Sequence, residues 1–131
     1  MNPPTPNGRQ SFVESLRNAG RGVGKLIRGE RNFRIHLLVT VCAMVLAGWL
    51  NFTVEHWSLL LLTIGLVLLT EAINSAIESL VDLVEPEKHP LAGRAKDIAA
   101  AAVLIASVIS VIIGVLLFGP PLMAVLIQLM K

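Results

Sequence analysis

Three apolar stretches limit what this chain of 131 residues can fold into. No Asp, Glu, Lys or Arg interrupts residues 35–54, 57–70 or 98–118. About 20 apolar residues in a helix are enough to cross the ~30 Å hydrocarbon core of a bilayer. Hydrophobic residues make up 54% of the chain and the mean hydropathy is +0.72, which is too apolar for a soluble domain of this size. We therefore expect an all-α membrane protein with three spanning helices, at residues 33–52, 57–84 and 95–118.

The segment before the first apolar stretch differs in composition and charge. Residues 1–10 are rich in Pro, Asn and Gly, which predicts a flexible N-terminus ahead of a single domain at residues 11–131. Residues 11–29 alternate apolar and basic side chains at helical spacing, which predicts an amphipathic helix lying in the membrane interface. Residues 1–34 carry a net charge of +5, which favours contact with anionic lipid headgroups. Nucleic-acid binding is not expected, because no aromatic residues alternate with the basic ones.

The basic residues also predict the orientation of the chain. Residues 1–34 contain seven Lys or Arg residues, the loop at residues 51–56 has none, and the loop at residues 85–97 has three. By the positive-inside rule, the N-terminus and the second loop lie on the cytoplasmic side of the cell membrane. Gly119-Pro120-Pro121 is expected to end the third helix, because proline cannot continue the helical hydrogen-bond pattern. The short apolar tail that follows is then placed at the opposite membrane interface.

A row of polar side chains follows the second apolar stretch on the same expected helix. Glu71, Asn74, Glu78 and Asp82 are spaced by three or four residues, so they share one face of a helix. At 1.5 Å per residue, Glu71 lies roughly 21 Å from the outer end of the span and is still inside the membrane. Glu78 reaches the cytoplasmic boundary and Asp82 passes it. Ionisable groups inside a span are costly and usually mark a functional site.

Other segments bring polar residues to the same boundary. Glu30 precedes the first span, and Lys96 and Asp97 precede the third. Carboxylate and amide oxygens suit Mg²⁺ and a lysine suits phosphate, and phosphoryl transfer needs these groups together. Two alternatives compete: the polar residues only hold helices together through hydrogen bonds, or Glu71 relays protons in a small ion channel subunit. The relay is disfavoured because the outer half of every span is uncharged.

Three motifs in this chain resemble a known enzyme family. They are ERNFRIH at residues 30–36, ExxNxxxExxxD at residues 71–82 and HxLxxxAKD at residues 89–97. In this order they are similar to the prokaryotic diacylglycerol kinase family of small integral-membrane lipid kinases. The resemblance covers about residues 11–118. It implies ATP as the phosphoryl donor, Mg²⁺ as the cofactor, and a homotrimer whose active sites combine residues of neighbouring subunits.

The resemblance also implies roles for individual residues. Glu71 matches the catalytic base that takes the proton of the lipid hydroxyl, and Asn74 stands between this base and the metal. Glu30 and Glu78 match the metal-binding carboxylates, and Asp82 has a supporting place in the same row. The positions that match nucleotide-binding residues are Glu87, His89, Lys96 and Asp97.

Two points stay open within the family. Members often use a residue early in the surface helix to contact the nucleotide, and Arg9, Arg17 and Arg21 compete for this role. The family also has two branches that differ in their lipid. ERNFRIH and VDLVEPEKHPLA are similar to the branch that phosphorylates undecaprenol, whereas GRAKD occurs in the branch that acts on diacylglycerol. We expect conversion of undecaprenol to undecaprenyl phosphate, with diacylglycerol to phosphatidic acid as the alternative.

Overall fold

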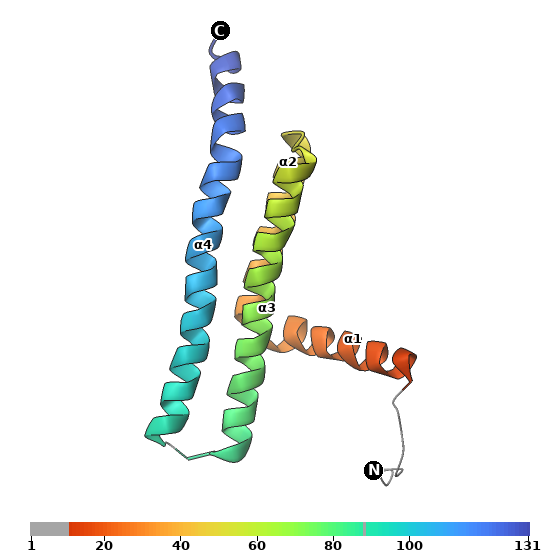
Figure 1. Cartoon of the computed structure of the whole chain (residues 1–131), viewed down its shortest axis with the longest axis vertical. Helices are drawn as coiled ribbons and strands as arrows, with labels where there is room; N and C mark the ends of the chain where they lie inside the picture. Colours follow the sequence, from red (N-terminus) through yellow and green to blue (C-terminus); the bar gives the residue numbers. More distant parts are fainter. Residues whose placement is uncertain (1–10, 88) are drawn as a thin grey trace.

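The computed structural model describes residues 11–87 and 89–131, and these residues form four helices (Figure 1). They are α1 (Phe12–Gly29), α2 (Arg31–Trp49), α3 (Val54–Val84) and α4 (Pro90–Leu129). The last three are each long and apolar enough to cross a membrane. The all-α class and the three long apolar helices expected from the sequence are therefore confirmed. The flexible N-terminus expected at residues 1–10 lies outside the described residues.

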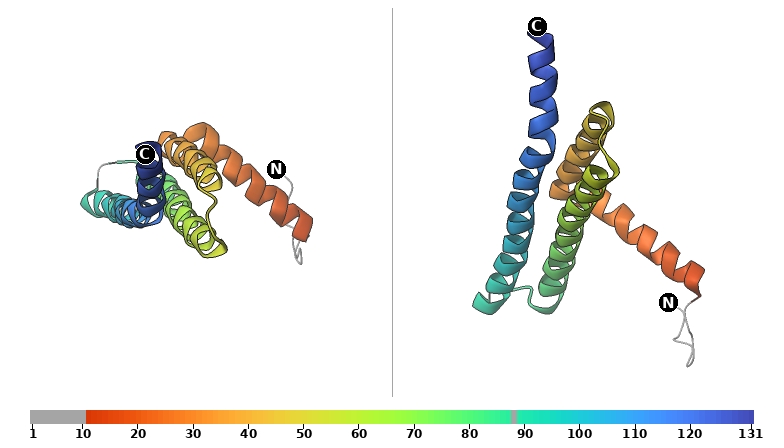
Figure 2. Two further views of the ribbon diagram at one scale, coloured as in Figure 1. Left: turned by 90° about the horizontal axis from the view of Figure 1, so that it is seen from above. Right: turned by 45° about the horizontal axis from the view of Figure 1, so that its top comes forward.

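The chain turns between α1 and α2 at a single residue. Glu30 has an extended backbone (φ −99°, ψ 113°) between the two helices, so the direction changes there without a loop. α1 consequently projects sideways from the other three helices (Figures 1 and 2). Its apolar side chains stay uncovered, with Phe12 81% and Leu16 64% exposed. No residue of α1 is buried by the rest of the described chain.

A small hydrophobic core lies where α2 turns into α3, which we call the α2–α3 end of the bundle. Ala47, Leu60 and Leu117 are buried there together. Phe52 from the turn and Phe118 from α4 pack against them, with ring centroids 4.8 Å apart. Through this contact α4 packs against the turn where α2 ends and α3 begins.

The turn itself is short and well specified by its residues. Asn51 adopts a left-handed backbone conformation (φ 53°), which asparagine tolerates better than most residues. Thr53 then caps α3, because its side-chain oxygen accepts a hydrogen bond from the backbone N–H of His56 at 3.4 Å. α3 runs back beside α2 and packs against both α2 and α4.

The opposite end of the bundle, where α3 connects to α4, we call the α3–α4 end. α4 begins at Pro90, a favoured residue at the first position of a helix. His89 caps it by accepting a hydrogen bond from the backbone N–H of Leu91 at 3.2 Å. Lys96 and Asp97 therefore stand in the second turn of α4, and Lys96 reaches the end of α3.

One expectation about α4 is wrong. The helix does not end at Gly119-Pro120-Pro121 but continues through both prolines to Leu129. Proline lacks a backbone N–H and crowds the preceding turn, yet its fixed φ is helical, so the helix can continue without those two hydrogen bonds. Prolines are tolerated in membrane helices, where local adjustments satisfy the freed carbonyl groups. Where the membrane boundaries cross α4 stays a prediction.

Candidate active site

The half of α3 that leads toward α4 buries polar side chains in an otherwise apolar helix. Glu71 is 2% exposed, Asn74 8% and Ser75 7%. Their spacing of one, three and four residues places them on one side of α3, toward the neighbouring helices. Burying a carboxylate or an amide is costly unless partner groups compensate. This buried polar face is therefore the first candidate for a functional site.

Asn74 and Glu78 form a hydrogen-bonded pair one helical turn apart. The Asn74 Nδ2 amide donates to Glu78 Oε1 at 2.9 Å. This bond fixes the orientation of the Asn74 amide and leaves its Oδ1 atom buried without a partner in the described part of the chain. A buried oxygen without a hydrogen-bond donor is costly. The Asn74 oxygen is thus available to a ligand.

Glu30 approaches this pair from the junction of α1 and α2. It lines a cavity of about 330 Å³ between α1 and α3, together with Lys25, Ser75 and Ser79. The charges of Glu30, Glu78 and His36 are also close enough to act on Glu71. The structure therefore brings Glu30, Glu71, Asn74 and Glu78, which come from two different segments, into one neighbourhood. We call these four residues the carboxylate cluster.

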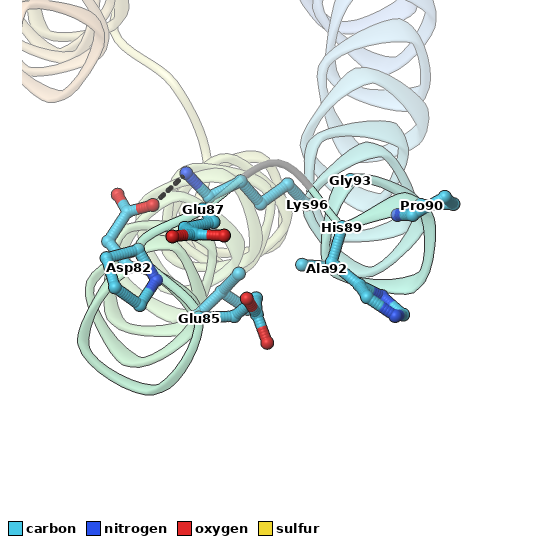
Figure 3. A pocket seen from close by; sticks show the side chains of 10 residues that line it. Asp82, Glu85, Glu87, His89, Pro90, Ala92, Gly93 and Lys96 are labelled. Carbon is cyan, nitrogen blue, oxygen red and sulfur yellow. Dashed lines mark hydrogen bonds and ion pairs between the residues drawn. The ribbon is translucent and has the colours of Figure 1, made fainter.

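A second polar site lies at the α3–α4 end. Asp82, Glu87, His89 and Lys96 all line a pocket of about 480 Å³ between α3, the connecting segment and α4. Figure 3 shows Lys96 reaching from α4 across to Asp82 on α3. Their Nζ and Oδ1 atoms lie 2.5 Å apart, although the residues are 14 positions apart in the sequence. Asp82 therefore orients the Lys96 ammonium group, the group that the sequence predicts to bind phosphate. We call this site the loop pocket.

The structure does not bring every expected residue into these two sites. Asp97 is exposed and does not line the loop pocket. Glu71 and Asp82 are 11 positions apart on α3, or about 16 Å along the helix. The carboxylate cluster and the loop pocket are therefore stacked along α3 rather than merged. Each of them contains part of the residue set expected from the sequence.

The donor atoms of the carboxylate cluster suit Mg²⁺. Within residues 11–87 and 89–131, no three His, Cys, Asp or Glu side chains converge closely enough to hold a metal by themselves. Mg²⁺ does not require this, because it is commonly held by one or two carboxylates together with substrate phosphates and water. Glu78 and Glu30 supply such carboxylates, and the unpartnered Asn74 oxygen supplies a third donor of the right type.

An apolar groove that the sequence did not reveal runs beside the carboxylate cluster. It has a volume of about 440 Å³ and is lined by α2, α3 and α4, from His36 near one end to Phe118 near the other. Apart from His36, its polar residues carry small hydroxyl groups, and the Ser110 Oγ atom is buried without a hydrogen-bond partner among the described residues. Such a groove depends on the spacing between helices. The only sequence signal is the set of small or hydroxyl residues Thr40, Thr63, Ser107, Ser110 and Gly114.

The chain is similar to known proteins over most of its length. The profile described as prokaryotic diacylglycerol kinase matches residues 17–118. Over 117 residues, the chain is 43% identical to an undecaprenol kinase of Bacillus subtilis (strain 168), covering 88% of this chain and 94% of that protein. Over 118 residues, it is 41% identical to a diacylglycerol kinase of Synechocystis, covering 89% of this chain and 67% of that protein. Over 109 residues, it is 38% identical to the diacylglycerol kinase of Escherichia coli (strain K12), covering 81% of this chain and 89% of that protein.

Proposed function

Because this chain belongs to the prokaryotic diacylglycerol kinase family and is a lipid kinase, we propose that it transfers the γ-phosphoryl group of ATP to undecaprenol. The observation that carries this proposal is a buried carboxylate, Glu71, placed one helical turn beyond the apolar groove at Val67. A lipid alcohol held in the groove would present its hydroxyl at this level. The relative named undecaprenol kinase supports undecaprenol, and the relatives named diacylglycerol kinase support diacylglycerol as the alternative.

Glu71 acts as the general base in this proposal. The lipid hydroxyl oxygen attacks the γ-phosphorus of ATP, its proton passes to the Glu71 carboxylate, and ADP leaves. Among the acids that line the face of α3, Glu71 lies furthest from the α3–α4 end and is the most buried. It is therefore the acid best placed to meet a hydroxyl that cannot leave the membrane.

Glu30, Glu78 and Asn74 hold the metal in this proposal. Bound Mg²⁺ would neutralise charge on the phosphate oxygens during transfer. The Asn74 amide donates to Glu78, so it aims one carboxylate oxygen while its own oxygen stays free for the ligand. This pair of residues places the metal-binding groups one turn (Asn74) and two turns (Glu78) from the base along α3.

Glu87, His89, Lys96 and Asp97 bind the nucleotide in this proposal. Lys96 supplies positive charge for the phosphates, and its bond to Asp82 fixes the position of its ammonium group. Glu87 and His89 line the same pocket. Asp97 lies on the same turn of α4 but outside the pocket, so its role depends on a bound nucleotide or on a neighbouring subunit.

A homotrimer, with active sites completed by residues of neighbouring subunits, fits the separation of the two sites. In a single chain Glu71 of the carboxylate cluster and Asp82 of the loop pocket lie about 16 Å apart along α3, and a second copy can bring its loop pocket closer to Glu71. α1 lies along the cytoplasmic membrane surface, because its exposed apolar side chains need lipid cover. The N-terminus and the active site face the cytoplasm in this arrangement.

The test of the proposed function is transfer of labelled phosphate from Mg-ATP by the purified full chain in lipid nanodiscs. Undecaprenol and diacylglycerol are offered in parallel at equal concentration. The variant Glu71→Gln serves as the blank, and Glu55→Gln, the same substitution at the other end of α3, serves as the matched control. We expect transfer to undecaprenol by the wild type and the control only. Preferential transfer to diacylglycerol would mean that diacylglycerol, and not undecaprenol, is the substrate. If Glu71→Gln were as active as the wild type, Glu71 could not be the general base.

A further inference from the structure

The last part of α4 has no partner in the described chain. The bundle ends where Leu117 is buried against Ala47 and where Phe118 packs on Phe52. Beyond this level α4 continues alone to the C-terminus (Figure 1). We call residues 120–130 the distal segment. It lies outside residues 17–118, which the family profile matches, so the family relationship assigns it no role.

The distal segment is too long to remain inside the membrane as a straight continuation of α4. From Ile98 to Met130, 33 consecutive residues contain no Asp, Glu, Lys or Arg. As a helix they measure about 50 Å, whereas the hydrocarbon core is ~30 Å thick. Fitting this length by tilt alone would require about 50°, which exceeds the usual range of spanning helices. A straight helix would therefore push its apolar end into water.

One face of the distal segment continues the exposed apolar surface of α4. Val108, Val115, Leu122 and Leu129 follow one another at intervals of seven residues, so they form a single stripe. Val108 is 51% exposed, Val115 66% and Leu129 78%, whereas Leu122 is only partly exposed. In a spanning helix these side chains face lipid. The stripe does not stop where the bundle stops, so the distal segment keeps a lipid-facing side.

The other face of the distal segment changes character where the bundle ends. Within the bundle this face carries Ala106, Ile113 and Leu117, which are wholly or partly buried against neighbouring helices. In the distal segment the same face carries only Pro, Ala and Gln, at positions 120, 124 and 128, and Lys131 follows the segment on this face. Small and polar residues replace large apolar ones at the point where the packing partners are lost. This pattern is typical of a helix that lies half in lipid and half in headgroups or water.

The prolines supply a place where the helix can bend. Pro120 and Pro121 donate no backbone hydrogen bonds, so the carbonyl groups of Leu116 and Leu117 lose their usual helical partners. Sharp changes in helix direction occur at such positions. A bend toward the Leu122 and Leu129 side would lay that face on the membrane.

We propose that the distal segment is a membrane-surface anchor: it bends at residues 119–121 and lies in the headgroup region of the leaflet opposite the active site. Leu122, Leu126 and Leu129 enter the acyl-chain region, while Ala124 and Gln128 face water. The partner of this surface is the lipid bilayer itself. The anchor fixes how deeply α4 lies in the membrane. It acts at the α2–α3 end of the bundle, far from the carboxylate cluster. This inference goes beyond the phosphoryl-transfer function and does not depend on it.

A pair of labelled variants tests the anchor. In a Cys42→Ser background, single cysteines at Leu126 and Gln128 are labelled with bimane, and Val115→Cys provides a reference inside the bilayer. The full chain is placed in vesicles of phosphatidylcholine and phosphatidylglycerol, and retained phosphate transfer shows that each variant is folded. The quenchers are phosphatidylcholine brominated on the upper acyl chain and aqueous iodide. We expect brominated lipid to quench position 126 at least threefold more than position 128, and iodide to show the reverse order.

Three results would overturn the anchor. Quenching of both positions by iodide and of neither by lipid would place the segment in water. Shielding of both positions from both quenchers would mean that other copies of the chain cover it. Equal lipid quenching of positions 115, 126 and 128 with no iodide access would mean that the segment is fully inserted in the bilayer. As a second readout, deletion of residues 120–131 should leave the rate of phosphate transfer within twofold of the full chain, and a larger loss would contradict an anchor remote from the active site.

Discussion

The two halves of α3 are packed by different rules. Near the α2–α3 end, Leu60 and Val67 are buried apolar residues, and the hydroxyl of buried Thr63 is satisfied by the Leu59 carbonyl at 2.7 Å. Near the α3–α4 end, the buried residues include Glu71 and Asn74, and the Asn74 Oδ1 atom has no partner within the described residues. In the first half the buried hydroxyl is satisfied within the helix, whereas in the second half the Asn74 Oδ1 atom is left for a ligand, a water molecule or another subunit.

The half of α3 near the α2–α3 end therefore mainly stabilises the fold, and we assign the chemistry to the half near the α3–α4 end. In a membrane, helix packing depends on close contacts, because lipid is as apolar as the side chains it replaces. The α2–α3 end supplies such contacts through Ala47, Leu60 and Leu117. The α3–α4 end instead holds buried polar groups that weaken the isolated fold and to which we assign the kinase chemistry. Substitutions in the two halves should therefore affect different measurements.

The largest effect is expected from Glu71→Gln. Removing a general base lowers a rate by about 10²- to 10⁴-fold, so kcat should fall to that extent while the KM for Mg-ATP changes little. Steady-state phosphate transfer to undecaprenol measures both constants. Glu55→Gln, at the other end of α3, is the control. If its kcat fell as far as that of Glu71→Gln, the loss would come from removing a negative charge and not from removing a base at position 71.

A smaller effect of another kind is expected from Glu78→Gln. This change removes one metal-binding carboxylate and weakens the partner of the Asn74 amide, so the KM for Mg-ATP should rise about tenfold or more. Titration of Mg²⁺ at fixed ATP checks this, because excess Mg²⁺ should recover part of the activity. If excess Mg²⁺ recovers nothing, the role of Glu78 in metal binding would be wrong.

A more moderate effect is expected from Lys96→Met. The substitution removes the positive charge of the loop pocket and leaves Asp82 unpaired, so the KM for ATP should rise about tenfold, which corresponds to ~1.4 kcal/mol of binding. Arg94→Met is the matched control, because Arg94 is a basic residue on the same helix that does not line the pocket. Equal effects of both substitutions would indicate a general loss of charge rather than a specific contact.

The smallest effect on activity is expected from Leu117→Ala. Leu117 is 5% exposed in the core of the α2–α3 end and does not line the apolar groove, so truncation should lower the free energy of unfolding by about 2–5 kcal/mol through lost packing. The transfer rate at low temperature should stay near that of the wild type. Unfolding in mixed detergent measures the stability, and Leu116→Ala is the control because Leu116 is 68% exposed. Loss of activity without loss of stability would break the separation between the two halves.

Some of this arrangement could be predicted from the sequence, because it depends on local rules. Hydropathy predicts three long apolar helices, and helical periodicity places Glu71, Asn74 and Glu78 on one face. The bond between Asn74 and Glu78 follows from their spacing of four residues. The sequence places Lys96 and Asp82 near the same membrane boundary. Their ion pair could not be predicted, because it depends on how the segment between α3 and α4 folds.

Other features could not be predicted because they depend on the tertiary structure. The apolar groove exists only because α2, α3 and α4 leave space between them. α4 continues through Pro120 and Pro121 although two backbone hydrogen bonds are lost there, because the fixed φ of proline is close to the helical value. The single-residue junction at Glu30 similarly results from one extended backbone conformation between two helices.

The most direct test of the account is to locate the metal along α3. Mn²⁺ is bound with a non-hydrolysable ATP analogue to the full chain in nanodiscs, and nitroxide labels are attached in a Cys42→Ser background at Ile73 or at Leu62. Both side chains are exposed, at 50% and 71%, and they lie in opposite halves of α3. Their separation of 11 residues is about 16 Å along the helix. We predict strong paramagnetic broadening of the label at position 73 and little at position 62. Equal broadening, or stronger broadening at position 62, would contradict the assignment of the chemistry to the α3–α4 half of the helix.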